Sequence, residues 1–137
     1  MALPVRVIAQ IPVGVYDGNM SDQHHHDVLE NLLPQHRTLR KQIPEVYKGF
    51  AALSSAALTD GALSRKVKEL MAMAIGVVQG CDGCIASHAQ AAARAGATAE
   101  EAAEAIGVTI LMHGGPATIY GARAYTAFCE FAGIETS

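Results

Sequence analysis

Apolar residues recur at every third or fourth position through most of this chain, which is the spacing of helices that bury one face. The clearest example runs from Arg65 to Val78, with Ser64 suited to cap its start and Gly80 suited to follow its end. The apolar positions that give this period are Val67, Leu70, Met71, Ala74, Ile75 and Val78. We therefore expect a helix over this segment.

The same reasoning predicts helices on both sides of that segment. A turn at 59–61 precedes it, and Pro44 marks a start or a break within an earlier helical stretch. Downstream, Thr98 and Glu101 have the spacing of a capping box, and Pro116 is suited to a first turn. The expected bounds are about 27–33, 37–56, 81–95, 98–112 and 116–131. The short connections predict an all-α helical bundle with mostly antiparallel neighbours.

The beginning of the chain lacks this helical period. Residues 1–22 contain Pro4 and Pro12, and we expect an extended N-terminal arm there, ahead of a single helical domain over 23–137. Three adjacent histidines, His24–His26, follow the arm. Neighbours in sequence diverge on a helix, and a metal site would need ligands from elsewhere. We therefore interpret the tract as a solvated helix entrance.

Composition and charge exclude several classes of protein. Half of the 137 residues are hydrophobic but only 5% are aromatic, which suits one domain of closely packed helices. The net charge of −3, without clustered Lys or Arg, argues against a nucleic-acid surface. There is no apolar stretch of membrane-spanning length and no signal peptide, so we expect a cytoplasmic protein with no membrane partner. The methionines expected to fill the core are Met71, Met73 and Met112.

Reactive residues gather in one stretch of the chain. Two residues separate Cys81 from Cys84, His88 follows four positions later, and Glu69 lies twelve positions before Cys81. Three cysteines without a secretion signal fit a reactive or metal-binding pair better than a structural disulfide framework. On a helix the two cysteines would be i and i+3, with Cβ atoms about 5–6 Å apart, and a small adjustment brings them into disulfide range.

The residues around the cysteines could move a proton. A thiol at a helix start faces the positive end of the helix dipole, which favours the thiolate. His88 is i+4 from Cys84, on the same face, and can accept a proton from a thiol. Glu69 can orient His88 if its helix runs antiparallel, although the helical pattern alone would place Glu69 on a solvated outer face. The pattern predicts a redox-active dithiol with Cys84, Cys81, His88 and Glu69 as catalytic residues.

A zinc site is the alternative for these residues. Cys81, Cys84 and His88 supply three ligands, and His113 or another subunit could supply a fourth. Zinc sites usually draw on two separated ligand pairs, whereas these three residues lie within eight positions, so the redox interpretation is favoured. Otherwise His113 is expected to be a helix-end residue, and Cys129 a buried, inert thiol.

Three motifs carry a resemblance to a known family. They are Lys68-Glu69-Leu70, Gly80-Cys81-x2-Cys84-x3-His88 and Gly114-Gly115-Pro116-Ala117. At this spacing, the stretch from about His36 to Phe131 resembles the carboxymuconolactone decarboxylase superfamily, and more narrowly its alkylhydroperoxidase D-like branch. One departure is Gly83, where that branch often has a histidine. The resemblance implies an all-helical fold.

The resemblance also implies a function, which is a thiol-dependent peroxidase that reduces organic or hydrogen peroxides as an antioxidant. Cys84 would attack the peroxide and become a sulfenic acid, and Cys81 would resolve it to an intramolecular disulfide. His88 and Glu69 would form the proton relay. We expect no cofactor and no metal. The resemblance implies a homo-oligomer, a trimer or hexamer, and a dithiol reductant, which in the family can be a lipoyl-bearing protein.

Two other functions stay open on the sequence. A carboxymuconolactone decarboxylase-like enzyme would keep its activity without the cysteines and would depend on His88 or Glu69. A non-enzymatic redox sensor or zinc-binding module would hold a metal, or bind a partner in one redox state only. The decarboxylase branch does not rely on a cysteine pair, so Cys81 and Cys84 favour the peroxidase.

Overall fold

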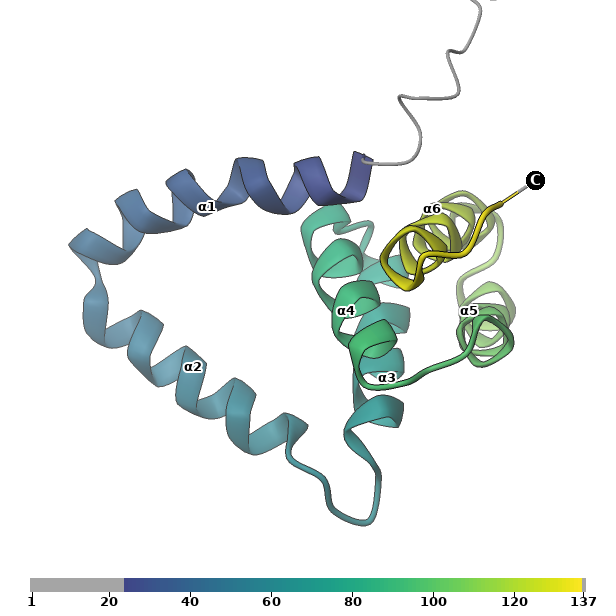
Figure 1. The fold of residues 1–137 in the computed structure, drawn as a ribbon, viewed down its shortest axis with the longest axis horizontal. Coiled ribbons are helices and arrows are strands. Elements are labelled where there is room, and N and C mark those ends of the chain that lie inside the picture. The colour runs from purple at the N-terminus through teal and green to yellow at the C-terminus, as the bar shows by residue number, and fades with distance from the viewer. Residues whose placement is uncertain (1–23, 137) are drawn as a thin grey trace, which may run out of the picture.

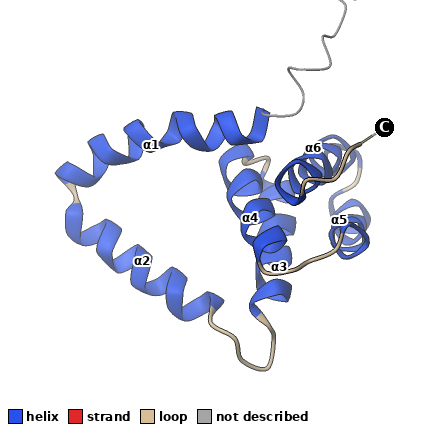
Figure 2. Ribbon diagram, viewed as in Figure 1, coloured by secondary structure: helices blue, strands red, loops and turns tan. Residues whose placement is uncertain are grey.

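The computed structural model describes residues 24–136, and the arm expected over 1–22 lies outside them. The described residues form six helices and no strand (Figure 2). The helices are α1 His24–Gln42, α2 Pro44–Leu58, α3 Arg65–Gln79, α4 Asp82–Arg94, α5 Ala99–His113 and α6 Gly115–Ala132. The all-α, single-domain fold expected from the sequence is thus confirmed. None of these six helices has the length and apolar character needed to cross a bilayer.

The helices divide into a four-helix body and a two-helix extension (Figure 1). Helices α3, α4, α5 and α6 pack on one another to form the body. In the extension, α1 leads away from the body and α2 returns to it, so that α1, α2 and α3 frame an open triangle in Figure 1. Among the described helices, α2 contacts only α1 and α3, and none of its residues is buried.

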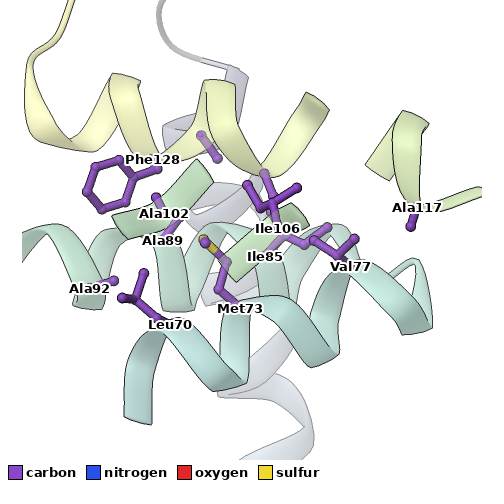
Figure 3. Packing of buried hydrophobic residues seen from close by; sticks show 12 residues of the cluster. Leu70, Met73, Val77, Ile85, Ala89, Ala92, Ala102, Ile106, Ala117 and Phe128 are labelled. Carbon is purple, nitrogen blue, oxygen red and sulfur yellow. The ribbon is translucent and has the colours of Figure 1, made fainter. Parts of the chain in front are cut away.

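The hydrophobic core lies within the body (Figure 3). Met73 of α3, Ile85 of α4 and Phe128 of α6 are almost fully buried there. Much of the remaining core is alanine, which lets the helix axes approach closely. Its other apolar members are Leu70, Val77, Ala89, Ala92, Ala102, Ile106, Ala117, Ala124 and Ala127. This packing fixes α3 against α4, the two helices that bear the predicted site residues.

The body helices begin and end at the residues that the sequence indicates. The Ser64 side chain accepts a hydrogen bond from the Val67 N–H at the start of α3. Thr98 and Glu101 form the expected capping box, with bonds of 3.2 Å and 2.9 Å in the two directions. Gly80 follows α3 with φ 63°, a left-handed conformation that favours glycine. Local capping therefore explains why these helix bounds could be predicted.

The extension differs from the expectation in one respect. The predicted gap between 33 and 37 is absent, because α1 continues through Pro34. A proline removes one backbone donor from a helix, and contacts of the preceding turns with α4 and α6 keep the chain helical here. The prediction that Pro44 marks a start or a break is confirmed, since α1 ends before Ile43 and α2 begins with Pro44 in its first turn.

Helix α3 buries a different face from the one that its strongest apolar positions predict. Its buried residues are Glu69, Leu70, Met73, Gly76 and Val77. A stripe on the other side is exposed by 36–56%, and we call it the α3 stripe: Val67, Met71, Ile75 and Val78. Met112 is also exposed, so of the three methionines expected in the core only Met73 lies there. Large contiguous apolar patches are a general feature of protein interaction surfaces.

Candidate active site

The Cys81–Cys84 segment joins the end of α3 directly to the start of α4. After Gly80 ends α3, the Cys81 N–H donates to the Gly76 carbonyl at 3.1 Å. Cys81 is the N-cap of α4, and its Sγ accepts a hydrogen bond from the Cys84 N–H at 3.2 Å. Cys84 therefore lies in the first turn of α4, where the positive end of the helix dipole favours an anion.

The two cysteines form a disulfide in this structure. Their Cα atoms are 5.2 Å apart, and both residues are partly exposed. The i, i+3 spacing at a helix start thus places both sulfurs within bonding range, as the sequence led us to expect. The pair lies in the segment 80–84 at the start of α4, which we call the cysteine loop, and a reagent from solvent can reach it there.

A hydrogen bond joins Glu69 of α3 to His88 of α4. His88 Nδ1 donates to Glu69 Oε2 at 2.8 Å, and Arg65 Nε lies 3.4 Å from the other carboxylate oxygen. Glu69 is only 1% exposed, so its burial would be costly without partners. The carboxylate orients the ring and keeps its proton on Nδ1, which leaves Nε2 for proton exchange. Glu69 thus lies on the inner face of α3, and not on the solvated face.

The structure brings the four predicted site residues onto two adjacent helices. His88 is one turn beyond Cys84 on the same face of α4, and its side chain is 31% exposed. Gly76 of α3 lies against Cys84, because a Cβ on Gly76 would be 3.3 Å from the Cβ of that cysteine. The close approach of α3 and α4 therefore places the dithiol and the Glu69–His88 pair along one seam.

Helix α1 also touches the cysteine loop, through a residue that no sequence motif indicated. Leu32 Cδ1 lies 3.0 Å from the position that a Cβ on Gly83 would occupy. Leu32 and Gly83 are both partly buried. The glycine between the two cysteines therefore leaves room for a side chain from α1, and a Cβ at this position would displace Leu32 by a few tenths of an ångström.

Helix α6 borders the other side of the loop. The Tyr120 ring lies against Gly80, with Cζ 3.1 Å from the place of a Cβ on that glycine. Arg123 stacks over the same ring at 5.1 Å, and its Nη1 is 3.6 Å from Asp82 Oδ1. These contacts connect residues about 40 positions apart in sequence, so helical periodicity in one segment could not reveal them.

The histidine tract is part of a contact between α1 and α6, and the expected solvated entrance is wrong for His25. His25 is 6% exposed, and its Nδ1 lies 2.8 Å from Glu130 Oε2. The backbone N–H groups of His25 and His26 also donate to the Glu130 carboxylate, at 3.2 Å and 3.0 Å. Glu130 thus caps the start of α1 from 105 residues away, a distance at which no sequence pattern signals a cap.

The remaining candidate residues lie outside the site. His113 is the exposed last residue of α5, as a helix-end residue should be. Cys129 is fully buried, which confirms the expected burial of this thiol. Across residues 24–136, no group of three or more His, Cys, Asp or Glu side chains is placed to hold a metal ion.

Residues 44–127 match the carboxymuconolactone decarboxylase family, and this range contains all four predicted site residues. The chain belongs to the carboxymuconolactone decarboxylase family. The superfamily indicated by the sequence motifs is thus confirmed, and the cysteine pair is consistent with its alkylhydroperoxidase D-like branch.

The chain is similar to two uncharacterized proteins and to one protein of known structure. It is 40% identical over 85 residues to an uncharacterized protein of Cupriavidus necator, an alignment that covers 62% of this chain and 75% of that protein. It is 39% identical over 84 residues to the uncharacterized protein 4 in the cox locus of Paracoccus denitrificans, covering 61% and 76%. The crystal structure of an apo carboxymuconolactone decarboxylase family protein from Legionella pneumophila has a TM-score of 0.77 and 41% identity, and covers 80% of this chain and 98% of that one.

Proposed function

We propose that this protein is a thiol-dependent peroxidase that reduces organic or hydrogen peroxides. The observation that carries the proposal is the Cys81–Cys84 pair at the start of α4, one helical turn from the hydrogen bond between buried Glu69 and partly exposed His88. The helix start favours a thiolate, and the imidazole offers a nearby acceptor for the thiol proton. Cys84 is the proposed attacking residue because it shares a face of α4 with His88, whereas Cys81 is the N-cap.

In the first step, His88 takes the proton of the Cys84 thiol, directly or through a water. The thiolate attacks one peroxide oxygen, so that an S–O bond forms and the O–O bond breaks. The other oxygen leaves as alkoxide or hydroxide and takes the proton back from His88, departing as alcohol or water. The sulfur is oxidised by two electrons to a sulfenic acid, and the peroxide is reduced by two.

In the second step, the Cys81 sulfur attacks the sulfenic sulfur of Cys84. The S–S bond forms, the S–O bond breaks, and the hydroxyl group leaves as water with the Cys81 proton. Because the Cα atoms already lie 5.2 Å apart, resolution can occur within one helical turn. An external dithiol then returns two electrons through a mixed disulfide, which fits a reducing compartment such as the cytoplasm. A lipoyl-bearing protein carries a dithiol of this kind.

The proposal can be tested by counting thiols. Reduced, metal-free protein has three thiols, and one equivalent of cumene hydroperoxide should remove two of them rapidly while sparing Cys129. Cys84→Ser should abolish peroxide turnover, and Cys81→Ser should leave a sulfenic acid that dimedone traps. Cys129→Ala is the matched control, with turnover expected to stay at the wild-type rate.

If all three thiols survive peroxide, the peroxidase proposal is wrong. Lactone decarboxylation that persists in a Cys81→Ser/Cys84→Ser variant and disappears in His88→Ala would support the family's name-giving activity instead. A partner that binds only the oxidised or only the reduced protein, without turnover, would identify a redox sensor.

We further propose that the chain forms a homo-oligomer through its extension. Val46, Phe50 and Leu53 follow one face of α2 and are 63–68% exposed, and the hollow between α1, α2 and α3 measures about 950 Å³. A helix of 15 residues with none of them buried is marginal by itself in water. A second copy would cover the α2 face with its α3 stripe, and the reverse contact would do the same, as in a two-fold interface. Three such pairs would make a hexamer.

A further inference from the structure

Helix α1 crosses the body at the level of the cysteine loop. Of its leucines, Leu32 is partly buried against Gly83, whereas the next residue, Leu33, is 54% exposed. Gly83 is one of the two residues between Cys81 and Cys84, so the Leu32 side chain lies against the segment that carries both cysteines. Gly83 has no side chain of its own, and the side chain that covers it comes from α1.

Two other sides of the cysteine loop are occupied by the body itself. Gly76 of α3 packs against Cys84, and Tyr120 of α6 packs against Gly80. Helices α3, α4 and α6 are joined by the core, so these sides of the loop cannot open without disturbing it. Helix α1 lies outside that core, and its single buried residue is His25.

One carboxylate ties the start of α1 to the body. Glu130 of α6, whose side chain is 4% exposed, accepts hydrogen bonds from the backbone N–H groups of His25 and His26, and lies 2.8 Å from His25 Nδ1. The His26 ring packs against Phe131 at 4.4 Å between ring centroids. The tie lies seven residues before Leu32, about two helical turns, so it fixes where that leucine stands.

We propose that α1 is a cover over the Cys81–Cys84 dithiol, in which Leu32 sets the size of the molecule that reaches the sulfurs and Glu130 positions the cover. The restriction on access stands on the contacts just described. Its consequence for substrate choice, a preference for small peroxides over bulky ones, rests on the proposed peroxidase function.

Access can be measured without any peroxide. The protein is reduced, freed of reductant, and treated either with iodoacetamide, which is small, or with the larger aromatic disulfide DTNB. Peptide mass mapping separates the site cysteines from Cys129. Leu32→Ala should raise the ratio of the DTNB rate to the iodoacetamide rate by at least about fivefold, because access is one of the factors that set thiol–disulfide exchange rates. Glu130→Gln, which keeps the size of the side chain, should raise the ratio in the same direction.

Leu33→Ala is the matched control, since it removes the same atoms from the neighbouring exposed residue and should leave the ratio unchanged. A ratio in Leu32→Ala equal to that of the wild type would overturn the cover. An equal increase in the rates of both reagents would overturn it as well, because that result indicates a change in the reactivity of the thiolate and not in access to it. If circular dichroism shows that Leu32→Ala is unfolded, Leu32→Val provides the same comparison with a smaller truncation.

Peroxide kinetics separate the two proposals. In Leu32→Ala, kcat/KM for cumene hydroperoxide should rise relative to kcat/KM for hydrogen peroxide. If Leu32→Ala shifts the reagent ratio but no variant turns over peroxide, the cover proposal is supported and the peroxidase proposal is refuted. If peroxide is turned over but Leu32→Ala changes neither the reagent ratio nor the ratio of the two kcat/KM values, the peroxidase proposal is supported and the cover proposal is refuted.

Discussion

His88 Nδ1 lies 2.8 Å from Glu69 Oε2, although the two residues are 19 positions apart and belong to different helices. The carboxylate is almost fully buried, and the imidazole lies between it and solvent. A buried carboxylate bonded to a partly exposed histidine is the arrangement that orients a general base. The pair therefore connects the packing of α3 on α4 to the proposed proton transfer.

Removing either member of this pair should slow peroxide-driven disulfide formation. His88→Ala removes the proton acceptor, and we expect a loss on the order of 10²-fold in rate, the usual contribution of general acid–base catalysis. Glu69→Gln keeps the shape but loses the charge that stabilises the imidazolium, so its loss should be smaller. Stopped-flow thiol consumption measures both rates, with the exposed Glu104→Gln as control. Wild-type rates in His88→Ala would remove His88 from the mechanism.

The contact of Gly83 with Leu32 predicts an energetic coupling between α4 and α1. Alanine in place of a helical glycine usually stabilises by about 0.5–1 kcal/mol, but a Cβ at Gly83 would lie 3.0 Å from Leu32 Cδ1. Gly83→Ala should therefore stabilise the Leu32→Ala variant more than the wild type, by a coupling of at least about 0.5 kcal/mol in urea unfolding.

Gly107 provides the control for this cycle, because nothing lies within 4 Å of a Cβ placed there. Gly107→Ala should change the free energy of unfolding equally in the presence and in the absence of Leu32. Equal effects of Gly83→Ala in both backgrounds would show that the α1 contact is absent in solution.

The course of the body helices could be predicted because their signals are local. Each cap lies within one helical turn of the groups that it bonds or of the helix end that it marks, so a short window of sequence contains the whole signal. These caps are Ser64, the Thr98–Glu101 box and Gly80. The four site residues could be proposed because their spacing along two consecutive antiparallel helices places them near one another. Their catalytic roles stay predictions.

The missed features depend on contacts distant in sequence. Glu130 meets His25 across 105 positions, and Leu32 meets Gly83 across a helix crossing, so neither side of the contact signals the other. The interpretation of His25 as solvated failed for this reason. The buried face of α3 also differs from the one that its apolar period predicts, because that helix is apolar on two sides and periodicity does not say which side the core takes.

Assembly should depend on the apolar face of α2. Phe50→Glu places a charge on a side chain that is 68% exposed in the single chain, and we expect it to dissociate the oligomer if a second copy covers that face. Ala52→Glu adds the same charge about 200° further round the helix and should leave the mass unchanged. Sedimentation velocity gives the mass of each variant. A Phe50→Glu protein of wild-type mass would exclude this interface.

Glu101 should contribute to acid sensitivity. The hydrogen bond from Lys66 Nζ, at 2.7 Å, and then the Thr98 N–H lower the pKa of Glu101 below its ordinary value of 4.5. A carboxyl whose pKa is lower in the folded state stabilises the fold above 4.5, and this stabilisation is lost as the pH falls through the folded-state pKa. Glu101→Gln should therefore lose less stability than the wild type in that window. Urea midpoints at neutral and acidic pH, with Glu104→Gln as control, measure the difference.

Helix α1 is synthesised long before the residue that caps it, Glu130. Helix α1 is the first described helix to leave the ribosome, but the carboxylate that caps it follows 105 residues later. At the usual rate of translation, that delay is about 5–20 s. During this time α1 lacks its cap, so it should dock last, after α6 has folded. Nascent chains arrested before Glu130 should accordingly remain sensitive to proteases within α1 while α3 and α4 are already protected.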